Sequence, residues 1–503
     1  MKNFFKPPKP VVRLTAFLLF GCCLLPELVL AQEERIRVET AVHLHSRYSF
    51  IGKLSLEEIL KHAKDKGIDA LLFTDHALVK ISYGLFPFRR LLRISVQKDS
   101  VFKKGLHRYL NEIKALNQKY PDLLLIPALE AAPFYYWEKS PLTQRGVVRD
   151  WNKHLLVMGL DEKGFRSLPL MGHGSVPLRP FRLTDLFRAW GALAIALGVV
   201  CYRKKAFDYR DETGRNLSPP STLFRAIGWT LLLIGGVSLI ENYPYRQPAF
   251  NIYSPDEKIL PYQTLIDDVQ KKGGLVFWAH PEGRTIPYEF SPVTFLTDPY
   301  PQALIETKNY TGFAIFFEGF KTIGPPGGIW DQLLLEYCRG KRQRPIWAIG
   351  ELDYSEEGKA MTWIDTVKTI VFSRERSQEA FLEAMKEGRM VAVRRSQEGE
   401  IVFGDFWVED AQTGRRAHLG ETLWVESFPK IGISLSQIGT VPDVRIRLIR
   451  DGETIREKKS LLPIDETYED PGFQGPLSYY RFEVRSDGGQ LLATNPIFVS
   501  RKR

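Results

Sequence analysis

Short apolar runs recur along the first part of the chain and are separated by segments with helical periodicity. Seven runs have the length of a strand and are rich in β-forming residues: 35–45, 68–76, 123–130, 154–160, 274–280, 313–319 and 345–353. The runs are nearly continuous rather than alternating, which is typical of strands buried on both faces of a parallel sheet. They predict a parallel sheet with helices between several of its strands.

A helix is predicted directly after the first run, in LSLEEILKHAKDKG at residues 54–67. Ser55 and Glu58 form a capping box, and Gly67 ends the segment. Its apolar stripe consists of Leu56, Ile59, Leu60 and Ala63. PYQTLIDDVQKKGG (261–274) has the same character. The pattern predicts an α/β fold that begins with a βαβ unit and closes into a barrel of about seven strands.

Polar residues with metal-binding side chains lie at the edges of these predicted strands. They are His43 and His45, Asp75 and His76, Glu130, His154, His280 and Asp353. Chemistry in α/β barrels gathers at the carboxyl ends of the strands, so we expect these side chains to meet. Taken singly, the two histidines could be half-buried core residues, Asp75 could cap a turn, and Glu130 or Asp353 could cap a helix dipole. Their joint placement favours a metal site.

A metal site would also resolve an electrostatic conflict among these residues. Several carboxylates in one pocket repel one another unless cations compensate them. Imidazoles and carboxylates together bind divalent Zn, Mn or Fe. Two such ions share a bridging carboxylate and a hydroxide, because metal binding lowers the pKa of water to about 7. The pattern therefore predicts a metal-dependent hydrolase that uses a hydroxide bridging two divalent metals.

The same segments resemble a known family. HLHS (43–46), FTDH (73–76), IPALE (126–130), NKHLLVMGL (152–160), GGLVFWAHPEG (273–283) and IGELD (349–353) resemble, in order, the motifs of PHP-domain metallohydrolases. The resemblance spans about residues 36–395 and implies a distorted seven-stranded (β/α) barrel. It implies that His43, His45 and Asp353 hold one ion, that His154 and His280 hold a second, and that Glu130 bridges them. The segment 362–393 and the tail after it resemble the exported branch typified by carbaryl hydrolase.

The resemblance departs from the family pattern at a third metal site. SRYSFIG (46–52) has no histidine, and Ser355 stands where the family has one. We therefore expect two divalent ions, with a third bound weakly or absent. Asp75 and His76 would then be the catalytic residues, either by orienting a ligand or by donating a proton to the leaving group.

Two uncharged stretches interrupt the predicted barrel, whose parts are residues 36–180 and 245–395. They are AWGALAIALGVVCY (189–202) and AIGWTLLLIGGVSLI (226–240). Each is shorter than the ~20 residues that cross a bilayer. If both stretches are extended outward within residues 186–241, their lengths approach that value. The loop between them is rich in Arg and Lys, as cytoplasmic loops are. We predict a transmembrane hairpin; the alternative is a pair of amphipathic or buried helices, on the barrel or in the membrane surface.

Residues 1–31 have the basic start, apolar centre and small-residue end of a signal peptide. An uncleaved anchor is the alternative. Lipid attachment at Cys22 is disfavoured, because Phe20, two positions before it, fits the motif poorly. Each alternative predicts an exported, membrane-attached protein with its barrel on the extracytoplasmic side. The four cysteines form no disulfide framework. Residues 396–503 alternate between strands and turns, such as VRIRLIR before Asp451-Gly452, and predict an antiparallel β-sandwich.

Composition narrows the partners. Apolar residues make up 44% and charged residues 25%, which excludes a disordered chain. The net charge of +10 suits a small anionic substrate or a membrane surface, while the sequence predicts no nucleic-acid binding. The family implies a phosphoesterase, with Arg47 and Arg284 as candidate phosphate-binding residues unless both have only surface roles. The alternatives are a carbamate or carboxylic-ester hydrolase and a non-catalytic, membrane-attached metal-binding sensor or scaffold.

Overall fold

The computed structural model describes residues 35–142, 144–173, 176–206, 209–215, 219–243, 245, 247–257, 259–317 and 319–501. The predicted signal peptide or anchor at residues 1–31 lies outside the described residues.

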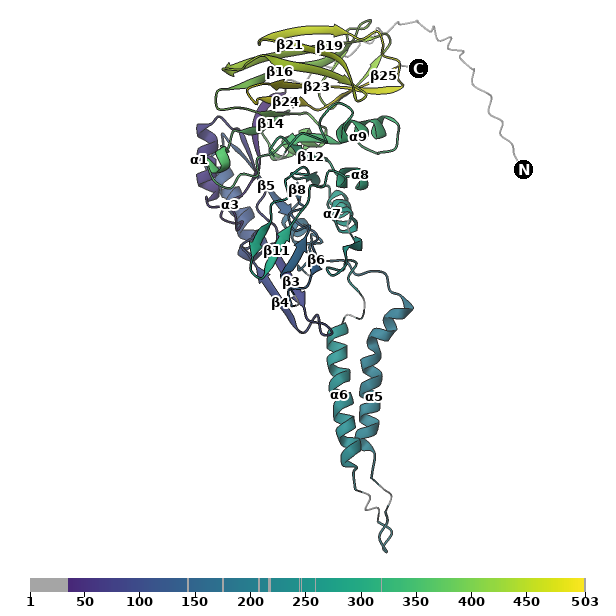
Figure 1. Ribbon diagram of the computed structural model, residues 1–503. Helices are drawn as coiled ribbons and strands as arrows, with labels where there is room; N and C mark the ends of the chain where they lie inside the picture. The colour runs from purple at the N-terminus through teal and green to yellow at the C-terminus, as the bar shows by residue number, and fades with distance from the viewer. Residues whose placement is uncertain are drawn as a thin grey trace, which may run out of the picture. The chain divides into compact units, whose positions relative to one another are not determined.

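All seven predicted runs form strands of one large sheet (Figure 1). They are β1 (Ile36–Leu44), β2 (Ala70–Phe73), β5 (Leu124–Ala131), β8 (Leu155–Met158), β9 (Leu275–Trp278), β12 (Gly312–Ile315) and β13 (Trp347–Gly350). Helices α1 (Leu56–Asp65), α2 (Val101–Lys104), α3 (Leu106–Lys119), α4 (Glu162–Arg166), α7 (Leu260–Lys271), α8 (Ala303–Glu306), α9 (Ile329–Cys338) and α10 (Gln378–Lys386) accompany them. Short 3-10 helices lie at Pro255–Glu257 and Lys359–Met361.

The βαβ unit at the start of the fold is confirmed. β1 and β2 pair in parallel, and α1 connects them. The Ser55 side chain accepts from the backbone N–H of Glu58, and the Glu58 carboxylate accepts from that of Ser55, which is the predicted capping box. The predicted apolar stripe of α1 is buried. Local sequence signals therefore place the first two strand ends, which carry four of the predicted site residues.

The predicted parallel order is wrong at one strand. β8 pairs antiparallel with both β5 and β9, whereas β2–β5, β9–β12 and β12–β13 are parallel. A parallel neighbour needs a crossover connection, usually a helix, and the chain between β5 and β8 instead forms the hairpin of β6 (Tyr136–Lys139) and β7 (Gly146–Arg149). The fold is mixed α/β, with one large sheet and several smaller ones.

Backbone hydrogen bonds join the end of β1 to the segment after β13. Leu352 N–H donates to the Val42 carbonyl at 3.1 Å, and Tyr354 N–H donates to the His43 carbonyl at 2.9 Å. In return, His45 N–H donates to the Tyr354 carbonyl at 2.7 Å. The first and last of the seven strands therefore meet at their carboxyl ends. Closure along the full length of a seven-stranded barrel stays a prediction.

Two small sheets extend the loops that follow the strand ends. β3 (Lys80–Gly84) pairs with β4 (Arg93–Gln97). The second sheet has the order β10-β11-β7-β6, with β10 at Tyr288–Phe290 and β11 at Val293–Leu296. A separate apolar cluster that includes Ile81, Trp137 and Phe295 joins the two small sheets.

The C-terminal part consists of strands, as predicted. The large sheet continues through β14 (Val367–Ser373), β15 (Met390–Arg394), β24 (Leu491–Thr494), β23 (Leu477–Ser486), β20 (Val444–Arg450) and β21 (Glu453–Ser460), with β25 (Ile497–Arg501) and β18 (Thr422–Val425) beside them. A second sheet contains β17 (Arg416–Ala417), β16 (Gly399–Asp410), β19 (Pro429–Gly439) and β22 (Ile464–Glu469). Asp451 and Gly452 form the predicted hairpin turn with φ of 52° and 87°.

The core of this C-terminal part reaches back before residue 396. Ile370, Val391 and Val393, on β14 and β15, belong to the same buried cluster as Phe406 and Phe482. One face of β14 and β15 therefore packs in the sandwich, while the two strands also continue the sheet of the metal-site strands.

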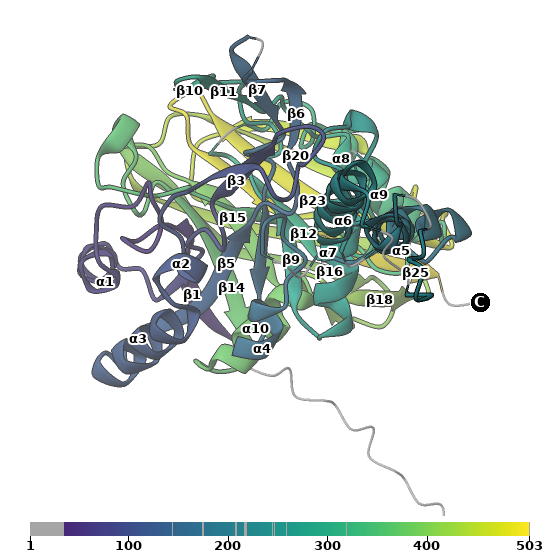
Figure 2. The same ribbon diagram turned by 90° about the horizontal axis from the view of Figure 1, so that it is seen from below.

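The apolar insertion forms two helices. A 3-10 helix (Leu183–Ala189) leads into α5 (Trp190–Arg203), and α6 (Thr222–Asn242) returns. Figure 2 shows both end-on and side by side. The segments Leu183–Arg203 and Thr222–Asn242 each have 21 residues and are long and apolar enough to cross a membrane, with 22% and 17% of their most apolar stretches buried. Membrane insertion stays a prediction.

Candidate metal centre

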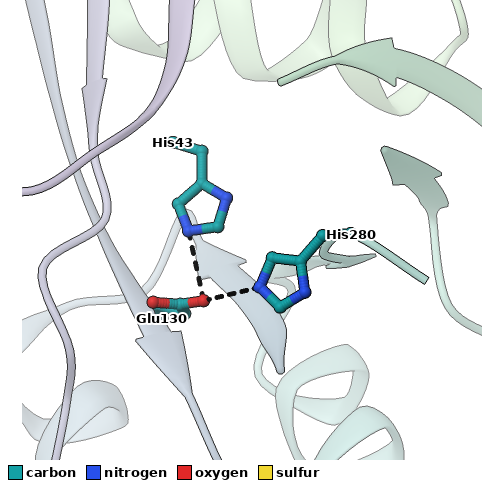
Figure 3. A group of neighbouring side chains, drawn as sticks. All are labelled: His43, Glu130 and His280. Carbon is teal, nitrogen blue, oxygen red and sulfur yellow. Dashed lines mark hydrogen bonds and ion pairs between the residues drawn. The ribbon is translucent and has the colours of Figure 1, made fainter. Parts of the chain in front are cut away.

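The carboxylate of Glu130, at the end of β5, is the centre of the site. One of its oxygens faces both His43 and His280 (Figure 3): Oε1 lies 3.1 Å from Nε2 of His43 and 3.3 Å from Nε2 of His280. The same oxygen also contacts Nδ1 of His154. Its Oε2 lies 3.2 Å from Nε2 of His45 and 3.2 Å from Nε2 of His76. The two oxygens of one carboxylate thus face different imidazoles, which is what a bridging ligand requires.

Asp353 completes this cluster from the segment after β13. Its Oδ1 lies 3.1 Å from Nε2 of His45 and 3.8 Å from Nε2 of His43. Three groups have ligand atoms that all lie within 4.8 Å of one another: His43, Glu130 and His280; His43, His45 and Asp353; and His45, His76 and Glu130. The structure therefore brings together all six residues that the sequence predicts as metal ligands, with His76 beside them.

The backbone is strained where the strands present these ligands. His43, His280 and Asp353 have φ of 71°, 29° and 46°, a region that residues other than glycine rarely adopt. His43 also lies at a bulge, where the pairing of β1 with β2 shifts between Val42 and Leu44. Bulges and left-handed residues re-aim side chains, and they persist near functional sites where the surrounding structure holds them.

The charges in this buried cluster are strongly coupled. Burial alone would raise the pKa of Glu130, but the imidazoles of His154 and His43 hold it well below its usual value. Burial alone would lower the pKa of His43, but the carboxylates of Glu130 and Glu351 raise it well above its usual value. His45 follows the same pattern: against burial, the adjacent carboxylates of Asp353 and Glu130 raise its pKa to about 9. Cationic imidazoles thus balance the buried carboxylates.

His76 is the exception among the histidines. Burial lowers its pKa to about 3 despite the attraction of Glu130, and repulsion from His45 and His154 acts in the same direction as burial. Its ring is therefore neutral.

Several buried ring nitrogens of the cluster make no hydrogen bond within the described part of the chain. They are Nε2 of His43, Nε2 of His45 and Nδ1 of His154, which lie at ion-pair distance from carboxylate oxygens without hydrogen-bond geometry, and Nδ1 of His76. Buried polar atoms without a hydrogen bond are rare in folded proteins and call for an explanation. Nitrogens that converge with carboxylate oxygens at ligand spacing fit a site for divalent Zn, Mn or Fe. The residues present therefore fit the metals that the sequence predicts.

Glu351, which the sequence analysis did not single out, supports two ligands. Its Oε2 lies 2.7 Å from Nδ1 of His43, and its Oε1 accepts from the backbone N–H of His280 at 2.5 Å. The side chain is 1% exposed. A signal existed: Glu351 is a carboxylate within the same IGELD motif as Asp353, two positions before it.

Asp75 lies behind the HLHS loop. Its carboxylate accepts from the backbone and hydroxyl of Ser46, both at 2.8 Å, and from the backbone and hydroxyl of Ser49 at 3.0 and 2.8 Å. The Ser49 hydroxyl also lies 3.1 Å from Nδ1 of His45 and accepts from the backbone N–H of His76 at 2.8 Å. Burial raises the pKa of Asp75. This carboxylate is positioned to fix the loop that carries His45.

The two candidate phosphate-binding arginines are exposed. The Arg47 guanidinium contacts Glu58 at 3.2 Å and donates to the Lys53 carbonyl at 2.7 Å, so it does not join the ligand cluster in this structure. Arg284 follows His280 in an exposed loop. A role of either residue in substrate binding stays a prediction.

Comparison with known proteins assigns part of the chain to a family. The family model of the PHP domain matches residues 41–173, so the chain contains a PHP domain there. This segment holds His43, His45, His76, Glu130 and His154. No curated protein matches the chain.

Three solved structures are similar at low identity. A two-domain protein from Bacteroides vulgatus, containing a predicted PHP-like metal-dependent phosphoesterase, is 13% identical over 90% of this chain and 91% of its own, with a TM-score of 0.33. An amidohydrolase from Chromobacterium violaceum is 15% identical over 64% of this chain and 89% of its own, with a TM-score of 0.26. An engineered protein is 13% identical over 20% of this chain and 21% of its own, with a TM-score of 0.13.

Proposed function

We propose that the protein is a metal-dependent phosphoesterase that acts outside the cytoplasm on a small anionic substrate. The observation that carries the proposal is the position of Glu130, a fully charged, buried carboxylate whose two oxygens face different histidines. The PHP domain at residues 41–173 supports the same class of reaction.

Two divalent ions are proposed, with Glu130 between them. His43, His45 and Asp353 would hold the first ion, and His154 and His280 the second. The group of His45, His76 and Glu130 offers a place for a third, but Ser355 instead binds the Lys359 ammonium at 2.9 Å. We therefore keep a dinuclear centre.

Ions bound there would polarise the phosphoryl oxygen of an ester and lower the pKa of a water shared between them. The chain's own residues keep the ligands in place. Glu351 holds the His43 ring and the His280 backbone, and Asp75 holds the His45 loop through Ser49. The neutral ring of His76 suits a proton acceptor or a further ligand better than an acid. Asp75 is a positioning residue in this mechanism, because it acts through Ser49.

We further propose that α5 and α6 span a membrane and place the metal centre on its outer side. α6, with 21 residues, is about 31 Å long, close to the hydrocarbon thickness of a bilayer, and the 3-10 helix together with α5 also has 21 residues. Aromatic residues lie at both ends: Trp190 and Tyr243 at one, and the edge-to-face pair Tyr202 and Trp229 at the other. Arg203 and the two lysines after it follow the second end, as expected for the cytoplasmic side.

The test is metal content and activity of the full chain purified in detergent. The wild type should contain about two divalent ions per chain and hydrolyse a nitrophenyl phosphate faster than a nitrophenyl carboxylate or carbamate. His43→Ala and Asp353→Ala should lose both metal and turnover, while His62→Ala, on the outer side of α1, should keep them. Unchanged metal content or turnover in both ligand variants would refute the proposal of a metal-dependent hydrolase. Faster cleavage of the carboxylate or carbamate than of the phosphate would show that the protein is an ester or carbamate hydrolase and not a phosphoesterase.

A further inference from the structure

The loop between β3 and β4 is basic and unusually apolar for an exposed segment. Phe86, Leu92 and Ile94 are 82%, 52% and 64% exposed, and Arg89, Arg90 and Arg93 lie between them. No acidic residue occurs between Lys80 and Lys98. The segment LFPFRRLLR (85–93) therefore interleaves apolar and aromatic residues with basic ones.

The apolar surface continues along β4. Side chains alternate along a strand, so Leu92, Ile94 and Val96 share one face. All three are exposed, at 52%, 64% and 36%. At the end of this face, Lys98 Nζ lies 4.5 Å from the ring centre of Phe290 on β10. Phe290 and its neighbours Ile286 and Tyr288 are also exposed. We call residues 85–96 the docking strip.

The docking strip is attached to one end of α6. The Glu241 carboxylate, in the last turn of α6, accepts from the backbone N–H of Arg90 at 2.8 Å and from that of Leu91 at 2.9 Å. The Arg90 guanidinium also lies 5.5 Å from the ring centre of Tyr243, the residue that caps the helix. Figure 1 shows β3 and β4 meeting this end of α6. The strip is therefore held at the level where the apolar helices end.

We propose that the docking strip lies in the outer headgroup layer of the membrane that α5 and α6 cross. Its apolar side chains would enter the boundary with the acyl chains, and Arg89, Arg90 and Arg93 would bind the phosphates of anionic lipids. The inference rests on the proposed membrane hairpin, because that hairpin sets the height of the strip. The position of the strip favours a bilayer as the partner. Helices that span a membrane end at the interface between lipid and water, and the strip is attached to such an end.

The strip is also tied to the metal-site side of the fold. β3 begins at Lys80, shortly after His76. The backbone N–H of Ser82 on β3 donates to the Tyr135 hydroxyl at 2.8 Å, and the Trp137 indole donates to the Ser82 carbonyl at 2.9 Å. Tyr135 and Trp137 follow Glu130 in sequence. Docking therefore fixes the loops after two ligand-bearing strands against the membrane surface.

The test uses the full chain in nanodiscs with its four cysteines replaced by serine. A bimane fluorophore is attached to Ile94→Cys, or to Phe86→Cys as a second site, and lipids carrying a quencher near the headgroup are added. We expect several-fold stronger quenching at both sites than at Leu461→Cys, which is 66% exposed on the C-terminal part. Anionic lipid should increase the quenching, and the combined change of Arg89, Arg90 and Arg93 to Ala should remove that increase.

A fourth label, on α6, separates the docking strip from the membrane hairpin. Leu233→Cys, on α6 and 69% exposed, should be quenched by lipids that carry the quencher deep in the acyl chains. Quenching at Leu233 without quenching at Ile94 would overturn the docking strip and leave the membrane hairpin standing. A lack of quenching at Leu233 and at Ile94 would overturn both. Protection of Ile94 by a protein partner instead would appear as equal quenching at Ile94 and Leu461.

Discussion

Glu351 binds the imidazole of His43 at 2.7 Å with one carboxylate oxygen, while its other oxygen accepts from the backbone of His280. Histidine ligands commonly donate their second ring nitrogen to a carboxylate, which fixes the ring and makes it a stronger ligand. Here a single side chain supports ligands assigned to both proposed ions.

Glu351→Gln is therefore expected to weaken metal binding about 10- to 100-fold while leaving the fold intact. A competition titration with a coloured chelator measures this affinity without relying on turnover. Glu356→Gln is the matched control, because Glu356 pairs with Lys53 at 2.7 Å on the exposed side of the same loop. Equal metal affinity in the two variants would remove Glu351 from the site.

Asp75→Asn should act on the same site through the loop of Ser46 and Ser49. The amide keeps the size of the carboxylate but presents a donor group to hydroxyl and amide donors, so about 1–3 kcal/mol of stability should be lost. Because Ser49 orients His45, we expect the variant to bind the first ion with lower affinity and to need a higher metal concentration for half-maximal activity. Ser49→Ala should reproduce the effect on affinity with a smaller loss of stability. If Asp75→Asn instead abolished turnover with full metal content, a direct catalytic role would replace the positioning role.

The positions of the site residues were predictable because they follow from strand ends. A strand end is a local feature, and His43, Asp75, Glu130 and His280 each directly follow or end a buried apolar run. The capping box of α1 was predictable for the same reason. The direction of β8 was not, because it depends on whether the long connection after β5 crosses over the sheet. Apolar content alone does not distinguish a parallel from an antiparallel buried strand.

Other features were missed because they depend on contacts between distant residues. In the sequence, Glu351 is only one residue of the IGELD motif. Its two partners, His43 and His280, come close to it only because the ends of β1 and β9 lie beside it in the fold. Likewise, β14 and β15 resemble the end of a barrel, yet one face of each packs in the sandwich core. The exposure of Phe86 and Ile94 also becomes visible only once the neighbours of β4 are known.

The buried pair of Asp331 on α9 and Arg481 on β23 should hold the C-terminal sheet against the helices of the metal-site part. Arg481 is completely buried and binds Asp331 at 2.7 and 2.6 Å, and Tyr479 donates to the same carboxylate at 2.8 Å. Removing one partner of a buried ion pair costs about 3–5 kcal/mol, because the other charge stays buried. Arg481→Met should lower the free energy of unfolding in urea by about this amount. Arg445→Met, which breaks an exposed pair with Glu457, should cost at most about 1 kcal/mol.

Stability should also depend on pH through Lys368, which binds Glu39 at 3.1 Å and Glu400 at 2.8 Å. Burial would raise the pKa of Glu39, but Lys368 and Arg37 lower it, so its contribution is lost as the pH falls below about 4. Burial would lower the pKa of Lys368, but Glu39 and Glu400 raise it, so its contribution is full below about pH 10 and lost above.

Lys368→Met should therefore lower the melting temperature most between these limits, and the difference from the wild type should shrink at both extremes. Thermal unfolding followed by circular dichroism across the pH range measures this difference. Lys430→Met, which removes an exposed pair with Glu469 at 3.5 Å, should give a small difference at every pH. A difference that does not change with pH would show that Lys368 stabilises the fold by packing alone.

Two adjacent glycines of α6 should respond in opposite ways to the same substitution. A side chain at Gly235 would meet the carbonyl oxygen of Gly191 on α5 at 2.6 Å, whereas one at Gly236 would have nothing within 4 Å. Small residues let membrane helices approach closely, and a larger side chain at the contact forces them apart. Gly235→Leu should lower the melting temperature of the detergent-solubilised chain, and Gly236→Leu should leave it unchanged or raise it slightly, because leucine favours a helix. Equal melting temperatures for the two variants would show that α5 and α6 do not pack through Gly191 and Gly235.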